Sequence, residues 1–249
     1  RATYAVQAAI QSAAAVLLIL TARAWDRPAS PEPAPAEPAP ARLAPAGPAP
    51  VRPAATPPPA ARMALLIAVA FAAVECGIES GAGIWGFVYL TAGRGLSTAA
   101  AAGTVSAYWA TMFAGRAVLG PVAERFGAGR VLTGGVAGLV AGAILLTVPG
   151  PAAVPVAGLV VVGLAAAPIF PLLTLATAEQ VAGQGDQADA TRAVSLQVAA
   201  SAGGNAALPA GLGLVIGTLT ASALGPALLL LSLLLAALHY WLGVRSRRR

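Results

Sequence analysis

The chain has 249 residues, of which 58% are hydrophobic and only 10% are charged, and its mean hydropathy is +0.78. Soluble domains carry about 25% charged residues, so this composition excludes a soluble globular protein and indicates one that crosses a membrane several times. The net charge of +6 does not indicate nucleic-acid binding, because the arginines fall in short loops and at the C-terminus rather than on one face of a soluble fold.

Seven apolar stretches are long enough to form transmembrane helices. They are expected at residues 3–20, 63–90, 98–121, 131–149, 152–178, 191–217 and 221–244. Residues 28–61 form an Ala/Pro tract without helical or strand periodicity, which predicts an extended linker. The expected fold is therefore an all-α, polytopic membrane protein, divided into a helix at 1–24, a linker at 25–62 and a six-helix bundle at 63–249.

The arginines predict the orientation of these spans. When the loops alternate between the two sides and the tail is placed inside, thirteen arginines lie on or near the cytoplasmic side, and only Arg1 and Arg94 lie outside. We therefore expect a multi-pass protein of the cell membrane whose linker and C-terminus are cytoplasmic. The same count argues against a cleaved signal peptide at residues 1–24, because cleavage would leave the linker and the tail outside.

Two carboxyl groups, those of Glu75 and Glu79, lie in the middle of the span at 63–90. A charged carboxylate at this depth costs roughly 3 kcal/mol or more, so both are expected to face protein, water or a solute. Their spacing puts them on one helix face, which Gly83 and Gly86 continue, and this predicts an open surface of small residues beside the acids. Like charges four residues apart repel, so one carboxyl should hold its proton more tightly. The alternative is a neutral Glu that is hydrogen-bonded between helices.

Other polar and aromatic side chains within the spans are further candidates. Gln197, Ser201 and Gly204 form a small polar stripe at helical spacing, with Asn205 at its edge. Such a stripe either joins helices by hydrogen bonds or lines a solute path. Tyr108 and Trp109 lie in mid-span rather than at an interface, where they either pack in the core or face a solute.

Two prolines interrupt the span at 152–178. Pro168 and Pro171 each remove a backbone donor, which predicts a bent helix with carbonyl groups in need of partners. Bent helices line cavities in transporters, and a buried structural kink is the alternative.

The stretch "GRAVLGPVAERFGAGRVL" at 115–132 crosses from one span into the next. It resembles the loop signature of the major facilitator superfamily, although Glu124 stands where Asp is commoner. By this resemblance, Gly120 would allow close helix approach, Gly127 a tight turn, and Glu124, Arg125 and Arg130 an ion-pair cluster at the cytoplasmic face. The alternative is an ordinary charged loop between helices. The residues of the implied conformational switch are Gly115, Arg116, Gly120, Glu124, Arg125, Gly127 and Arg130.

Four further stretches, taken in order, resemble the fucose-permease-like branch of that superfamily. They are "IESGAGIWGFVYLTAGRGLS" from residue 78, "YWATMFAGR" from 108, "GLAAAPIFPLL" from 163 and "SLQVAASAGGNAALPAGLGLV" from 195. The resemblance implies that the chain is the sixth helix, the central loop and helices seven to twelve. The rest of a six-helix first half would then be missing, in agreement with a first residue that is not Met.

The resemblance also implies a function. The protein would be a secondary transporter that works by alternating access, with protons driving the movement of a sugar-like solute and with no cofactor or metal. Glu79 precedes Trp85 by six residues, as in the family pattern, so it would contact the solute or the coupling proton while Glu75 tunes it. Tyr108 and Trp109 would stack on the solute. Drug or metabolite efflux by the same fold is the alternative, and a membrane scaffold is a more distant one.

An intramembrane enzyme is the remaining function class. A rhomboid-like protease needs a Ser in a Gly-x-Ser-Gly turn and a His partner, whereas "GIESG" places Ser80 at the wrong glycine spacing and His239 is the only histidine. The sequence also contains no HExxH motif. We therefore expect a protein that is not an enzyme.

Overall fold

The computed structural model describes residues 59–182 and 187–246, which form helices and short connections with no strand among them. The first expected span and most of the linker lie outside these residues. The helices are α2 (Pro59–Val88), continued by the π-helical turn η1 (Tyr89–Gly93), α3 (Thr98–Ala117), α4 (Leu119–Phe126), α5 (Ala128–Thr147), α6 (Ala153–Ala166), α7 (Ile169–Ala182), α8 (Gln187–Thr218), the 3₁₀ turn η2 (Ala221–Ala223) and α9 (Leu224–Ser246).

The expected spans and the observed helices agree closely, with two differences. The described residues contain five helices that are long and apolar enough to cross a membrane, and α3 is not among them. Although α3 has 20 residues, it is rich in Ala, Thr and Ser and ends with Arg116 in its last turn, so its hydropathy is too low for it to be counted as a spanning helix. The second difference is that α2 begins at Pro59 rather than at residue 63, because proline is well tolerated in the first turn of a helix.

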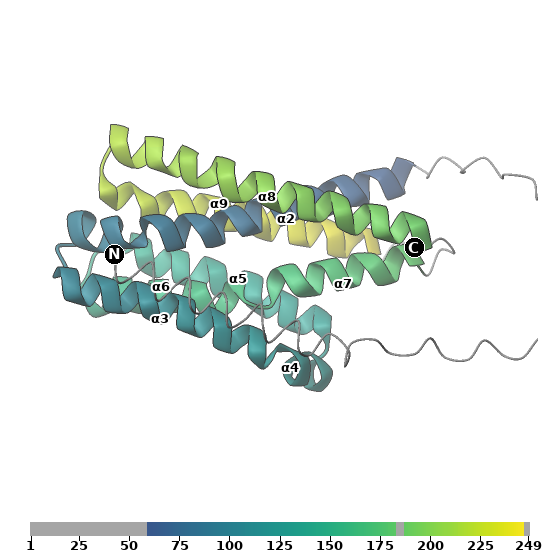
Figure 1. Ribbon diagram of the computed structural model, residues 1–249, viewed down its shortest axis with the longest axis horizontal. Helices are drawn as coiled ribbons and strands as arrows, with labels where there is room; N and C mark the ends of the chain where they lie inside the picture. The colour runs from purple at the N-terminus through teal and green to yellow at the C-terminus, as the bar shows by residue number, and fades with distance from the viewer. Residues whose placement is uncertain (1–58, 183–186, 247–249) are drawn as a thin grey trace, which may run out of the picture. The chain divides into compact units, whose positions relative to one another are not determined.

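The bundle of described helices has two ends, which we name the η1 end and the α4 end (Figure 1). At the η1 end, the Ser222 hydroxyl donates to the Gly93 carbonyl at 2.9 Å. At the α4 end, Thr133 of α5 and His239 of α9 share a hydrogen bond of 2.9 Å. Consecutive long helices therefore run in opposite directions, as repeated crossing of a bilayer requires.

Helices α2 and α8 run parallel to each other and pack through small residues. A Cβ atom added to Gly204 of α8 would lie 2.0 Å from the carbonyl oxygen of Ala73 in α2. One turn further along, a Cβ on Gly77 would meet Leu208, and the next turn repeats the pattern with Gly81 and Leu212. Small residues at such a contact let two helix backbones approach closely, which is the usual basis of helix association in membranes.

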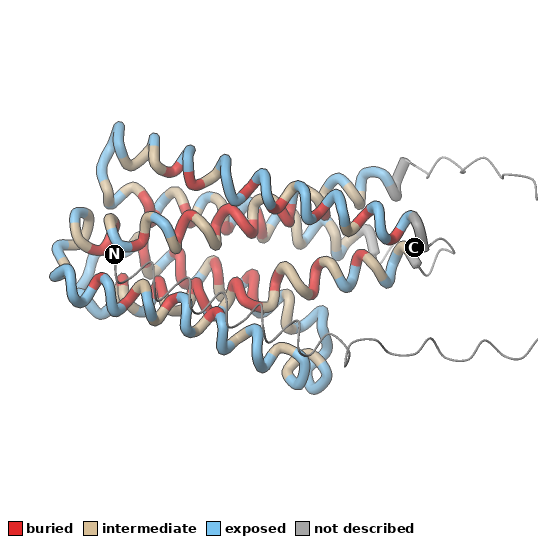
Figure 2. The backbone as a smooth tube through the Cα atoms, in the orientation of Figure 1, coloured by how far each residue is buried: buried red, intermediate tan, exposed pale blue. Residues whose placement is uncertain are grey.

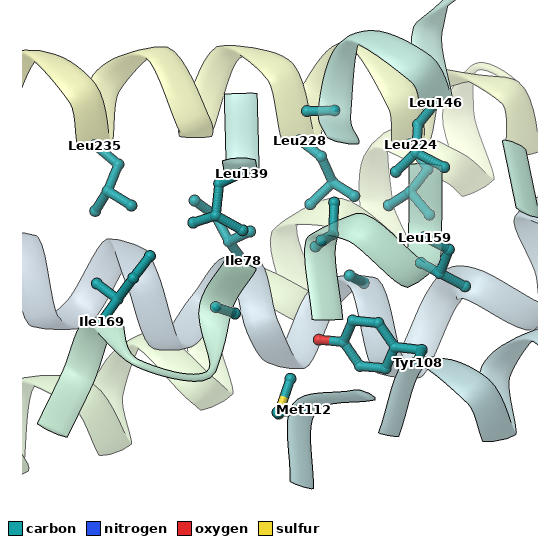
Figure 3. Packing of buried hydrophobic residues seen from close by; sticks show 14 of the residues in the cluster. Ile78, Tyr108, Met112, Leu139, Leu146, Leu159, Ile169, Leu224, Leu228 and Leu235 are labelled. Atoms are coloured by element: carbon teal, nitrogen blue, oxygen red, sulfur yellow. The ribbon is translucent and has the colours of Figure 1, made fainter. Parts of the chain in front are cut away.

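Apolar side chains gather between the helices, and other apolar side chains face outward. Figure 2 shows the buried residues along the inner sides of the helices. Figure 3 shows Leu139 of α5 close to Ile78 of α2, within a cluster that also contains leucines of α6 and α9, and with Tyr108 and Met112 of α3 on the other side. Phe113, Leu214 and Leu230 are among the large apolar residues exposed on the outside. An apolar exterior around an apolar core is what a lipid environment favours.

Prolines shape two of the long spans. The bend predicted at Pro168 is confirmed, since α6 ends at Ala166 and α7 begins at Ile169. Pro171 lies in the first turn of α7, where a backbone N–H would have no partner within the helix, so the proline removes no helical hydrogen bond. Pro209 lies inside α8, and the indole N–H of Trp85 in α2 donates to its carbonyl oxygen at 2.8 Å.

Arg94 connects two helices at the η1 end. It is one of the two arginines that the loop assignment places outside. Its guanidinium donates to the Tyr89 hydroxyl at 2.7 Å and to the carbonyl oxygens of Leu146 and Val148 at 2.9 and 2.5 Å. These carbonyl groups lie at the C-terminus of α5, where a cation is favoured by both the free acceptors and the helix dipole. Arg94 therefore ties the end of α2 to α5.

The loop signature at 115–132 forms the short helix α4 instead of the expected tight loop. Gly127 has φ +86°, so the expected turn is confirmed there. Among the described residues, nothing lies within 4 Å of a Cβ added to Gly120, so the close approach expected there is not found in this part of the chain. Gly115 lies in a close contact instead, because its added Cβ would lie 2.7 Å from Ala167.

The expected ion-pair cluster of Glu124, Arg125 and Arg130 is also wrong for the described part of the chain, where these three residues form no ion pair. All three side chains are exposed, and the Arg125 guanidinium lies 5.6 Å from the Phe126 ring centre instead. Exposed charges at a helix end interact with solvent, so nothing forces them together.

Candidate functional site

The strongest polar contact within the bundle joins Glu79 of α2 to Arg116 of α3. The Arg116 Nη2 atom lies 2.8 Å from Glu79 Oε2, at ion-pair and hydrogen-bond distance. The Arg116 side chain is 46% exposed and the Glu79 side chain 15% exposed. Because a half-exposed ion pair facing lipid hydrocarbon would be expensive, this surface is suited to water, a solute or another protein segment.

The local structure explains how these two residues meet. Helical side chains lean toward the N-terminus of their own helix. Glu79 on α2 therefore leans toward the α4 end, whereas Arg116 in the last turn of the antiparallel α3 leans toward the η1 end. The two side chains approach each other along the seam between the helices.

A second polar contact lies next to the first, between α2 and α8. The Ser80 hydroxyl donates to Asn205 Oδ1. Ser80 follows Glu79 directly, so their Cα atoms are about 3.8 Å apart. The indole of Trp85, one turn further along α2, donates to the Pro209 carbonyl as described above. Helix α2 thus carries an ion pair toward α3 and a neutral hydrogen bond toward α8 at almost the same height.

Trp109 lies beside the ion pair, on the seam between α2 and α3. Its side chain is 46% exposed, and a Cβ added to Gly83 would lie 2.5 Å from its ring. The expectation of an open small-residue surface along Gly83 and Gly86 is therefore wrong. Trp109 covers Gly83, and Leu159 packs 3.1 Å from the Cβ position of Gly86. A glycine has no side chain, so a side chain from a neighbouring helix can pack directly against its backbone.

We call the partly exposed residues on this side the open polar face. The open polar face consists of Glu79, Ser80, Trp109, Arg116 and Asn205. It contains three of the seven residues that the sequence named as candidates for binding a solute or a proton. The other four are buried.

Glu75 is the most surprising of the buried candidates. Its side chain is fully buried, its Oε2 atom accepts a hydrogen bond of 3.2 Å from the Cys76 thiol, and its Oε1 atom has no partner among the described residues. A buried carboxylate with one weak donor would be strongly unfavourable in an apolar bundle. This environment fits a neutral carboxyl group, which was the alternative reading of Glu75.

Of the three remaining candidates, Gln197 and Tyr108 join two helices, and Ser201 forms its hydrogen bond within its own helix. The Gln197 side chain donates to the Thr177 hydroxyl of α7 at 2.9 Å, and the Ser201 hydroxyl donates to the Val198 carbonyl within α8 at 2.8 Å. The Tyr108 hydroxyl is also turned inward, where it donates to the backbone carbonyl of Glu79 at 2.7 Å. Of the two roles considered for this polar stripe, the joining of helices agrees better with these contacts.

Sequence reasoning missed two members of the open polar face as site residues. The loop signature assigns Arg116 to the conformational switch, but the position of this residue in the last turn of α3 also allows it to lean into the membrane. The sequence places Ser80 directly beside Glu79, and this is a sufficient signal that Ser80 shares the surroundings of the acid.

Comparison with known proteins gives the family. The family model for the Major Facilitator Superfamily matches residues 1–209. The chain belongs to the major facilitator superfamily. A comparison with curated proteins finds no match. The protein belongs to a transporter superfamily, and its described residues contain five apolar helices long enough to span a membrane, so it is a multi-pass membrane transporter.

In this major facilitator protein, the open polar face offers one acid, one base, two neutral polar groups and one indole. Such a set can bind a solute and, by opening and closing the Glu79–Arg116 ion pair, can take up and release a proton. No group of His, Cys, Asp or Glu able to hold a metal ion occurs in the described residues, and the face itself has a single carboxyl group.

Proposed function

We propose that the protein is a proton-coupled secondary transporter that moves a small polar solute by alternating access, with Glu79 as the residue that carries the coupling proton. The observation that carries this proposal is the Glu79–Arg116 ion pair of 2.8 Å within the span of α2. When Glu79 is ionised, it pairs with Arg116; when Glu79 is protonated, the pair loses its attraction and Arg116 is released. The protonation of one carboxyl group thereby controls whether α2 and α3 are joined by an ion pair.

Alternating access requires a second bundle against which the described helices rock. Glu79 and Ser80 lie about halfway along the α2–η1 rod, which fits a solute site near the bilayer midplane. The resemblance to the fucose-permease-like branch favours a sugar-like solute, and the arginine distribution favours a cell-membrane protein with a cytoplasmic linker and C-terminus. Drug or metabolite efflux remains the alternative, and no observation in the bundle favours it over uptake.

The test is Glu79→Gln in the full-length protein reconstituted into vesicles. Glutamine keeps the shape and the hydrogen bond to Arg116 but cannot titrate. Solute accumulation driven by a proton gradient should fail, while exchange of labelled for unlabelled solute should continue because it needs no net proton movement. Accumulation at the wild-type level would show that Glu79 does not carry the coupling proton.

A further inference from the structure

The two partners of the ion pair are exposed to different extents. The Arg116 side chain is 46% exposed, against 15% for Glu79. A guanidinium has five N–H donors, and the bond from Nη2 to Glu79 is the one hydrogen bond that the Arg116 side chain makes within the described residues. The cation thus presents its unused donors to the open polar face, where a planar carboxylate could be bound by two parallel hydrogen bonds.

The charges around this face decide which solute it can accept. Arg116 is the one charged residue of α3, and α6 contains no titratable residue. On α2, the neighbouring acid Glu75 is buried, and the Tyr108 hydroxyl of α3 faces the Glu79 backbone. From α8 the face receives the neutral Asn205, since Asp189 and Arg192 lie at the start of that helix, four turns or about 20 Å away.

The open polar face is therefore neutral when Glu79 is ionised and carries one positive charge when Glu79 is protonated. A proton together with one monoanion restores neutrality, whereas a dianion would leave an excess negative charge and a cation an excess positive one. Uncompensated charge in a site of low dielectric constant is unfavourable. The charge count therefore favours a monoanionic solute that enters with one proton.

The neighbouring contacts suggest the rest of the solute. Ser80 and Asn205 offer a hydroxyl and an amide that form a hydrogen bond with each other and can exchange it for bonds to solute hydroxyl groups. The half-exposed indole of Trp109 offers an apolar surface on which C–H groups can pack.

We propose that the transported solute is a hydroxylated monocarboxylate, such as a sugar acid, whose carboxylate replaces Glu79 as the partner of Arg116 and whose hydroxyl groups bind Ser80 and Asn205. This inference rests on the proposed proton-coupled transport. It adds that proton and solute are linked by competition: protonation of Glu79 is what makes Arg116 available.

Three matched compounds test the proposal by calorimetric binding to the full-length protein. Gluconate carries a carboxylate and hydroxyl groups, glucitol carries the hydroxyl groups alone, and hexanoate carries the carboxylate alone. Gluconate should bind most tightly, and one proton should be taken up with it. Hexanoate should bind roughly 2- to 10-fold more weakly than gluconate if one neutral hydrogen bond is lost, and up to roughly 100-fold more weakly if two are lost. Glucitol should bind more weakly still.

Variants of the open polar face test which residue binds each group of the solute. Arg116→Gln should weaken gluconate binding at least about 10-fold, because hydrogen bonds to a charged group are lost, and should leave glucitol binding unchanged. The control is Arg192→Gln, whose arginine is 76% exposed and pairs with Asp189 at the start of α8. Asn205→Ala should weaken gluconate binding but not hexanoate binding.

The pH dependence of gluconate affinity shows whether the solute carboxylate competes with Glu79 for Arg116 or is only attracted to the positive charge of Arg116. In the wild type, gluconate affinity should fall about tenfold per pH unit once Glu79 is ionised in the free protein, because binding then takes up one proton. In Glu79→Gln, Arg116 has no anionic competitor, so gluconate affinity should be at its maximum and independent of pH. Glu79→Gln should fold even if Arg116→Gln does not, because glutamine is close in shape to glutamate. The half-exposed Arg116 can also be solvated when its anionic partner is removed.

Two results would overturn the inference. One is glucitol binding as tightly as gluconate; the other is gluconate binding that does not change in Arg116→Gln. If glucitol moved with protons and Glu79→Gln abolished that coupling, the proposed function would stand and only the solute class would be wrong. If Glu79→Gln still accumulated solute with protons, the proposed function itself would fail.

Discussion

The close contact between α2 and α8 predicts that alanine substitutions at two consecutive glycines, Gly203 and Gly204, have different effects on stability. A Cβ on Gly204 would lie 2.0, 2.7 and 2.9 Å from the carbonyl oxygen, carbonyl carbon and Cα of Ala73. All three are backbone atoms, so no side-chain rotation can relieve the overlap and the helices must move apart. Gly203, the preceding residue on the same helix, has nothing within 4 Å of its Cβ position.

The magnitudes follow from these distances. Alanine in place of glycine favours a helix by up to about 1 kcal/mol at either position. At Gly204 the overlap should cost roughly 1–3 kcal/mol, the usual range for overpacking. Gly203→Ala should therefore be neutral or stabilising, and Gly204→Ala should be less stable than Gly203→Ala by about 1–3 kcal/mol.

The assay is the free energy of unfolding of both variants in detergent micelles, with solute binding as a second readout. Because Asn205 follows Gly204 directly, moving α8 away from α2 should also break the Ser80–Asn205 hydrogen bond and weaken binding. Equal stability of the two alanine variants would show that α2 and α8 do not approach each other closely at Gly204.

Three further expectations concern other contacts. Arg125→Ala should slow turnover while leaving equilibrium solute affinity nearly unchanged, because the resemblance of its loop to the family signature implies a role in the conformational switch; a large loss of affinity with normal turnover would contradict this. Trp85→Phe should lower the free energy of unfolding by about 1 kcal/mol by removing the donor to the Pro209 carbonyl, and no change would mean that water replaces the indole. Arg94→Gln should speed hydrogen exchange at the C-terminus of α5, where the Leu146 carbonyl loses a donor; unchanged exchange would contradict the tie between α2 and α5.

The positions of the spans could be predicted from the sequence because each one reflects local chemistry. A bilayer demands about 20 apolar residues in a row, so the hydropathy pattern predicted the helices to within a few residues. The break at Pro168 and the turn at Gly127 are also local, since a missing N–H or a positive φ is a property of the residue itself.

The contacts of each helix face could not be predicted in the same way. The spacing of Glu79 and Gly83 shows that they share a face, but not that Arg116 pairs with the acid from 37 residues away while Trp109 covers the glycine. Likewise, Gly120 and Gly115 look equivalent in the loop signature, and only the position of α6 shows which of them lies in a tight contact. Periodicity gives the direction of a side chain, and tertiary packing gives its partner.

We propose that Glu79, and not its neighbour Glu75, carries the coupling proton. The two acids are one helical turn apart, yet Glu79 pairs with Arg116 at a partly exposed surface and Glu75 is buried beside Cys76. The direct measurement is the number of protons moved per solute by vesicles containing Glu79→Gln or Glu75→Gln. We predict that Glu79→Gln abolishes proton movement with the solute and that Glu75→Gln leaves the ratio unchanged. Loss of proton movement in Glu75→Gln, with a normal ratio in Glu79→Gln, would instead assign the coupling proton to Glu75.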